Sequence, residues 1–133
     1  MNGEQQDAPL NSFRILFYAA AAYNFVWGIV AIFFPTAILS AVHVSVEHIS
    51  FFQCIGMLVF VYAFAYWLIA RDPARYTPLV WVGLLGKTLG PIGCVWAAAT
   101  GDFPWTFFYI SILNDVIWWP AFWIFALKYG RNL

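Results

Sequence analysis

The chain has 133 residues, of which 64% are hydrophobic and only 9% charged, and its mean hydropathy is +0.79. This composition excludes a water-soluble domain, because too few polar residues are present to cover the surface, and it indicates a membrane protein. The net charge is zero and only six residues are Lys or Arg. A nucleic-acid-binding protein, which needs a basic surface, is therefore excluded as well.

Residues 1–14 form a polar head, and the first long apolar run follows at 15–34. The head has no positive charge before Arg14, and no small-residue cleavage site follows the run. We therefore expect a retained membrane-spanning helix and not a cleaved signal peptide. Pro35 predicts the end of this helix, because proline is tolerated only in the first turn of a helix.

The longest connection between apolar runs covers 35–50. Over 41–49 three valines alternate with polar residues, which predicts an extended or amphipathic segment on the outer membrane interface. The alternating residues are Val42, His43, Val44, Ser45, Val46 and Glu47.

Three further apolar runs follow, at 51–70, 79–100 and 106–127. Each run has about 20 residues, the helical length that crosses a hydrocarbon core of about 30 Å. A β-barrel is excluded because the runs do not alternate between apolar and polar residues. The sequence therefore predicts an all-α membrane protein whose single domain, 15–127, is a four-transmembrane-helix bundle.

Two short connections join the last three runs. Residues 71–78 contain Pro73 and Pro78, which predict a helix stop followed by a helix start. Residues 101–105 predict a tight outer turn. Because such short connections leave no room for a crossover, the consecutive helices that they join are expected to lie side by side and antiparallel.

Five of the six basic residues follow one pattern along the chain. They precede the first run, separate the second from the third, or follow the fourth, whereas the connections 35–50 and 101–105 carry no Lys or Arg. By the positive-inside rule, both termini, including the tail 128–133, and the 71–78 loop are predicted to be cytoplasmic. The five residues are Arg14, Arg71, Arg75, Lys128 and Arg131.

Lys87 and Asp115 lie in the middle of the third and fourth runs. A charged group near the bilayer centre costs about 2.5 to 3.5 kcal/mol on insertion scales, so it normally faces the bundle interior and has a partner. At a rise of about 1.5 Å per residue, the two lie at depths that a lysine side chain can bridge. We therefore predict that they pair. Such a pair fits a structural role, a ligand-binding or catalytic site, or proton or ion translocation.

A stripe of small residues marks one face of the third run. Glycines recur at intervals of three and four from Gly83 to Gly93 and predict close helix packing. Lys87 lies at the edge of this stripe, which directs it towards a neighbouring helix or an internal cavity. Pro91 and Pro120 each remove a backbone hydrogen bond beside a charged residue, so both helices are expected to have a loosened turn there.

Further polar and aromatic residues complete a candidate ligand-binding site. Asn24 and Tyr62 come at the depth of Lys87 in the first two helices, and Asn114 adjoins Asp115. The fourth run also carries many aromatic residues, which suit either lipid contact or the wall of a pocket for an apolar guest. The predicted site comprises Asn24, Tyr62, Lys87, Asn114, Asp115, Trp118, Trp119 and Phe122.

Cys54 and Cys94 come at similar depth in the outer halves of adjacent helices. Neither has a cation nearby in the sequence, so two unpaired, packed thiols are expected and not a redox pair. Gln53, and as an alternative to a ligand-binding role also Asn24 and Asn114, suit interhelical hydrogen bonds. No spacing of His, Cys, Asp and Glu fits a closed set of metal ligands, and we expect neither a metal site nor another cofactor.

Three segments resemble an uncharacterised bacterial family of small four-span membrane proteins: YNFVWG at 23–28, FFQCIGMLVFVYAFAYWLIARDPARYTPLVWVGLLGKTLGPIG at 51–93 and PWTFFYISILNDVIWW at 104–119. Some members carry the label alkyl hydroperoxide reductase, which the two cysteines do not support, because that chemistry needs an accessible thiolate and a resolving partner. In general layout the chain is also similar to the DoxX-like proteins, of which some are linked to quinone-dependent oxidoreductases. The resemblance implies four spans and the bacterial inner membrane, and it implies no catalytic residue.

These features predict an integral membrane protein that binds an apolar small molecule, of lipid, quinone or isoprenoid type, beside Lys87 and Asp115. Two other classes stay open. One is an accessory subunit of a larger membrane complex or a homo-oligomer. The other is an intramembrane lipid-modifying enzyme in which Asp115 or Lys87 moves a proton. The sequence favours a binding protein over an enzyme.

Overall fold

The structure is a computed structural model of the chain and describes residues 4–130, with side chains described from Leu10 onward. Residues 1–3 of the predicted head and 131–133 of the predicted tail, among them Arg131, lie outside the described residues. Within the described range every element of regular structure is helical, which confirms the all-α prediction.

Three of the predicted spans are single helices. They are α1 (Glu4–Phe33), α3 (Ile49–Arg71) and α5 (Leu79–Ala99). α1 begins inside the predicted polar head, and its part that is apolar enough to cross a membrane starts at Leu10. α3 and α5 are long and apolar enough to cross a membrane over their whole length.

The fourth span is divided into short segments. From Trp105 to Tyr129 it is also long and apolar enough to cross a membrane, so the structure has the four predicted membrane-spanning segments. Its parts are η1 (Trp105–Phe107), α6 (Phe108–Ser111), the π-helix η2 (Ile112–Val116) and α7 (Trp119–Tyr129).

Local sequence signals account for where the helices end. Pro35 opens the short helix α2 (Pro35–Ala41) directly after α1. Asp72 follows α3, and its Oδ1 accepts a hydrogen bond from the backbone of Arg75, which caps α4 (Pro73–Tyr76). Gly101 follows α5 with a φ of 84°, a left-handed conformation that glycine adopts without strain. The predicted turns are therefore confirmed.

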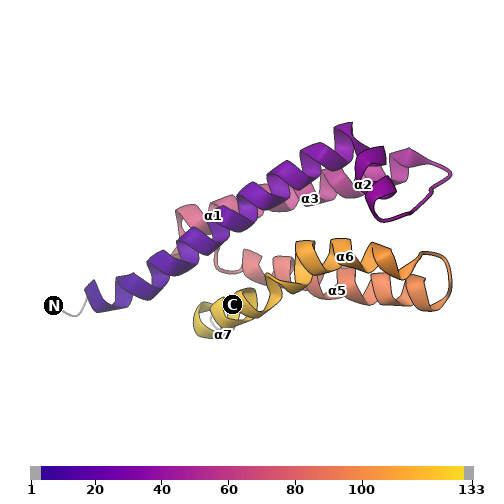
Figure 1. The fold of residues 1–133 in the computed structure, drawn as a ribbon. Coiled ribbons are helices and arrows are strands. Elements are labelled where there is room, and N and C mark those ends of the chain that lie inside the picture. Colours follow the sequence, from indigo (N-terminus) through magenta and orange to yellow (C-terminus); the bar gives the residue numbers. More distant parts are fainter. Residues whose placement is uncertain (1–3, 131–133) are drawn as a thin grey trace.

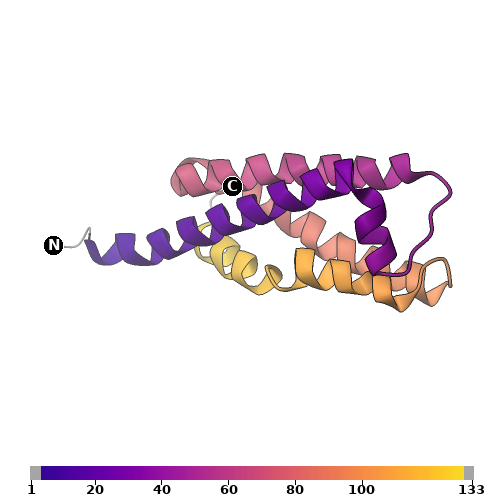
Figure 2. The same cartoon turned by 45° about the horizontal axis from the view of Figure 1, so that its top comes forward.

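The four spans pack as two layers. Figures 1 and 2 show α1 along α3 in one layer, and α5 along α6 and α7 in the other. Both ends of the described chain lie at the same end of the bundle, as an even number of spans requires. α1 approaches α3 closely, since a Cβ atom on Gly28 would lie 3.0 Å from the carbonyl oxygen of Gly56.

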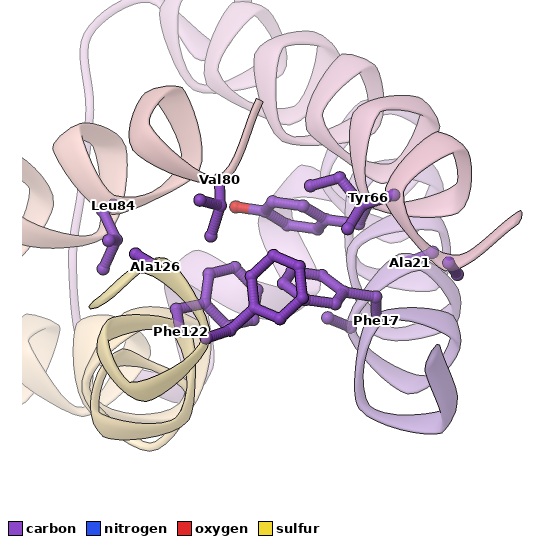
Figure 3. Packing of buried hydrophobic residues seen from close by; sticks show 11 residues of the cluster. Phe17, Ala21, Tyr66, Val80, Leu84, Phe122 and Ala126 are labelled. Carbon is purple, nitrogen blue, oxygen red and sulfur yellow. The ribbon is translucent and has the colours of Figure 1, made fainter. Parts of the chain in front are cut away.

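Two apolar clusters join the layers. The larger lies towards the end that carries both termini, where Phe17, Tyr66 and Phe122 meet from three helices (Figure 3). The ring centroids of Phe17 and Phe122 are 4.8 Å apart, and those of Tyr66 and Phe122 are 5.0 Å apart. The smaller cluster lies at the opposite end of the bundle and comprises Ala31, Leu39, Val42, Val44 and Phe52.

The long connection after α1 closes the end of the bundle that lies away from the termini. α2 crosses from α1 towards the fourth span (Figure 2). In the segment that follows, Val42 and Val44 are buried while His43 and Ser45 are exposed, which confirms the predicted alternation. Thr106 Oγ1 donates a hydrogen bond to the carbonyl of Val42 and ties this segment to the fourth span. The apolar side of the segment is therefore covered by the bundle.

Candidate functional site

Lys87 and Asp115 form an ion pair between α5 and η2, as the sequence predicts. Lys87 Nζ lies 3.8 Å from Asp115 Oδ1, and it donates a hydrogen bond of 2.7 Å to the backbone carbonyl of Asn114. The side chain of Lys87 is 3% exposed and that of Asp115 is 12% exposed. Both charges are thus enclosed by the bundle, and neither is turned outward into the lipid.

Neighbours on its own span hold the carboxylate of Asp115. Ser111 Oγ donates to Oδ2 at 3.3 Å, and Asn114 Nδ2 donates to Oδ1 at 3.0 Å. Asp115 lies in the wide turn of η2, which is closed by a 3.1 Å bond from Ile117 N to the carbonyl of Ile112. Single π-helical turns insert one residue into a helix and are frequent at functional sites. The predicted loosened turn is therefore confirmed in the fourth span.

The glycines of α5 make room for side chains of other elements. Gly86 lies against the ring of Tyr62, and Gly90 lies against the carboxylate of Asp115. The glycine stripe faces inward as predicted, and the space that its glycines leave is taken by these side chains of neighbouring helices. α5 continues through Pro91 as one helix, although proline has no amide hydrogen to donate to the carbonyl of Lys87.

The two layers enclose a cavity of about 450 Å³ beside the ion pair. This volume falls within the range of small-molecule binding sites. The aromatic part of its wall is formed by Trp27, Phe52, Phe103 and Phe107. The polar part is formed by Asn24, Tyr62, Lys87, Ser111, Asn114 and Asp115. The sequence predicts one polar group at similar depth in each span, namely Asn24, Tyr62, Lys87 and Asp115. The structure brings these four residues together around this cavity.

Three predicted site residues do not line the cavity, so the aromatic wall predicted from them is wrong. Phe122 is fully buried in the larger apolar cluster, against Phe17. Trp118 packs against Tyr23, with ring centroids 5.6 Å apart. Trp119 is 39% exposed, and its indole N–H donates a 2.9 Å hydrogen bond to the Thr88 hydroxyl. The aromatic residues that line the cavity come instead from α1, α3, the turn before the fourth span and the beginning of that span, where Phe107 lies.

Sequence reasoning missed several lining residues for which the chain holds a signal. Trp27 follows Asn24 by three residues, and Ser111 precedes Asp115 by four, so each pair shares one helix face. Phe52 shares a face of α3 with Tyr62, and Phe107 precedes Ser111 by four residues. Phe107 also belongs to the aromatic residues of the fourth run that suit either lipid contact or the wall of a pocket. Phe103 lies in the turn before the fourth span, and the packing of the layers brings it to the cavity.

The remaining polar residues of the spans behave in different ways. Gln53 Nε2 donates a 2.8 Å hydrogen bond to the carbonyl of Ile32, which confirms the predicted interhelical bond. Asn24 is buried at the cavity, and its Oδ1 has no hydrogen-bond partner. Both cysteines are free, as expected. Cys94 lines the cavity, whereas Cys54 is exposed and is not packed as predicted.

A second hollow of about 460 Å³ lies between α1 and α3. Its lining is apolar and aromatic and includes the Tyr18 ring, and no charged side chain lines it among the residues that the structure describes. The cavity beside Lys87 and Asp115 is therefore the better candidate, because it combines apolar walls with polar groups that orient a ligand. No protein-family model, curated protein or solved structure matches the chain.

Proposed function

We propose that this multi-pass membrane protein binds an apolar small molecule with a polar end, of lipid, quinone or isoprenoid type. The observation that carries the proposal is the division of the cavity wall into an aromatic part and a compact polar part around Lys87 and Asp115. Such a wall binds an amphiphile in one orientation, because the polar end gains charge-assisted hydrogen bonds only at one place.

The rim of the cavity supports access from the bilayer. Ile55 and Leu58 of α3 and Leu89 of α5 line the cavity and are also exposed on the outside of the bundle. In a membrane these side chains contact acyl chains. A guest dissolved in the bilayer therefore reaches the cavity between α3 and α5 without crossing water.

We further propose the bacterial inner membrane as the location, with both termini cytoplasmic. Arg14 lies near the end of α3, where its Nε donates a 2.9 Å hydrogen bond to the carbonyl of Ala70. Arg71, Arg75 and Lys128 lie at the same end of the bundle, and by the positive-inside rule this end faces the cytoplasm. The DoxX-like layout, with its link to quinone-dependent enzymes, makes a quinone one candidate guest.

The proposal is tested by purifying the protein from its native membrane in polymer-bounded lipid discs and identifying the small apolar molecules that accompany it. We expect one class of molecule to be enriched over the bulk lipid. The Gly93→Phe variant should lose this enrichment, because Gly93 lines the cavity and a Cβ atom there meets nothing within 4 Å. The control Ile92→Phe places the same ring on an exposed position and should retain it.

Two results contradict the proposal. One is wild-type protein that carries only bulk lipid, and the other is Gly93→Phe protein that keeps the enriched molecule. If membrane proteins co-purify in fixed ratio without any enriched small molecule, the accessory-subunit class replaces the binding function. If the protein converts the bound molecule chemically and Asp115→Asn abolishes this conversion, the protein is an enzyme.

A further inference from the structure

We infer that the polar end of the guest is an uncharged hydroxyl group that donates a hydrogen bond to the carboxylate of Asp115. This inference rests on the proposed function and names the chemical class of the ligand. It follows from three features of the polar part of the cavity: its charge balance, the enclosure of Lys87 and the unused acceptor positions of Asp115.

The charges at the cavity cancel. Lys87 and Asp115 are the only charged side chains that line it among the described residues, and they are 3.8 Å apart. A phosphate, a carboxylate or an ammonium group on the guest would leave one charge uncompensated inside the hydrocarbon region, which costs several kcal/mol in a site of low dielectric constant. A neutral polar end leaves the balance intact.

The ammonium group of Lys87 is already surrounded by protein groups. It donates to the carbonyl of Asn114 and faces Asp115, and the ring centroids of Tyr66 and Phe122 each lie 5.4 Å from Nζ. Both rings attract a cation through their π-electrons. An anionic headgroup therefore finds no open approach to Lys87, whose side chain is almost completely buried.

The carboxylate of Asp115 is the more accessible of the two charged groups, and it only accepts hydrogen bonds. It accepts hydrogen bonds from Ser111 and Asn114, and carboxylate oxygens hold about four acceptor positions. Two amide oxygens nearby, Asn114 Oδ1 and Asn24 Oδ1, have no partner. The more accessible charged group of the cavity is thus an acceptor with positions to spare, and a guest that donates a hydrogen bond fits it.

A hydroxyl group also suits Tyr62, whose side chain lines the same cavity. The phenolic O–H can donate to the oxygen of the guest while the guest donates to Asp115. Two kinds of membrane molecule share this chemistry, namely long-chain or isoprenoid alcohols and the hydroquinone form of a quinone. The oxidised quinone has only acceptor oxygens and is expected to bind more weakly.

The test uses photoreactive dodecanol, with a diazirine near the far end of its chain, and its methyl ether, each added at the same membrane concentration to the protein in phosphatidylcholine vesicles. After illumination, mass spectrometry of peptides measures labelling of residues that line the cavity, such as Trp27 and Phe107. We expect the alcohol to label these peptides at least about tenfold more than the ether, the ratio that one hydrogen bond to a charged group supplies.

Matched variants show whether the polar pair causes the difference. In Lys87→Met/Asp115→Leu protein both charges are absent together, and the alcohol should lose its advantage over the ether. Tyr109→Phe removes an exposed hydroxyl from the same span and should leave the ratio unchanged. Competition by unlabelled dodecanol should exceed competition by dodecanoate, dodecylammonium or dodecyl phosphate by a similar factor.

The outcomes separate this inference from the proposed function. Equal labelling by alcohol and ether, or strongest competition by a charged headgroup, overturns the hydroxyl preference and leaves the binding function intact. Absence of saturable cavity labelling by either probe overturns both. Competition by decylhydroquinone and decylquinone distinguishes the two kinds of hydroxyl-bearing guest. Stronger competition by decylhydroquinone than by dodecanol identifies a quinol, and the reverse order identifies an alcohol.

Discussion

Gly90 lies directly against the carboxylate of Asp115: a Cβ atom at position 90 would come within 2.7 Å of Asp115 Oδ2 and 3.4 Å of its Cγ. Position 90 is one turn after Lys87 on the same helix, so the third span both supplies the cation and leaves the space for its partner. The same glycine stripe continues to Gly93, which borders the open cavity and meets nothing. These two glycines provide a sharp comparison.

Gly90→Ala should lower the free energy of unfolding by about 1–3 kcal/mol, because the new methyl group overlaps a carboxylate whose position is fixed by hydrogen bonds. Gly93→Ala on the same helix should be neutral or stabilising by up to about 1 kcal/mol, since alanine favours the helix and finds open space. Unfolding in mixed detergent micelles measures both. Equal effects of the two variants would refute the close contact at position 90.

Lys87→Met should destabilise the protein by about 3–5 kcal/mol, because it leaves the carboxylate of Asp115 buried without its cation. Lys87→Met/Asp115→Leu should recover most of this loss, since well-packed apolar side chains replace a buried ion pair at little cost. A double-mutant cycle on unfolding free energies measures the coupling. Additive effects of the two substitutions would show that the pair does not interact.

The contact between α1 and α3 predicts that Gly56→Ala destabilises the first layer. The added Cβ would lie 2.8 Å from the Cβ of Ala31 and 3.3 Å from the carbonyl oxygen of Gly28, and a helix backbone cannot move aside locally. We expect a loss of about 1–3 kcal/mol in the free energy of unfolding. Gly93→Ala serves as the control, and stability equal to wild type at position 56 would contradict the packing.

Thr106→Val should loosen the segment that closes the end of the bundle, because it removes the hydrogen bond to the carbonyl of Val42 while keeping the side-chain shape. We expect faster amide hydrogen exchange over residues 42–46 with little change in the core of α3. Thr100→Val is the control, since the Thr100 hydroxyl bonds only within its own turn region. Unchanged exchange over 42–46 would show that this bond does not hold the segment.

The membrane-spanning segments, their turns and the pairing of two charged residues were predictable from the sequence. Hydropathy and proline or glycine signals act over short stretches of chain, and they gave the four spans and the bends at Pro35, Asp72 and Gly101. The high cost of an isolated charge in lipid leaves Lys87 and Asp115 few partners, so depth alone indicated their contact.

The cavity and its aromatic wall were decided only by the tertiary structure. The π-helical turn at 112–116 adds one residue to the fourth span, and the 3.2 Å bond from Trp118 N to the carbonyl of Asp115 closes a tighter turn directly after it. Regular periodicity alone therefore does not give the faces on which Trp119 and Phe122 lie. Phe52 and Phe107 reach the cavity because two layers of helices separate beside the ion pair, and such a separation depends on contacts between distant parts of the chain.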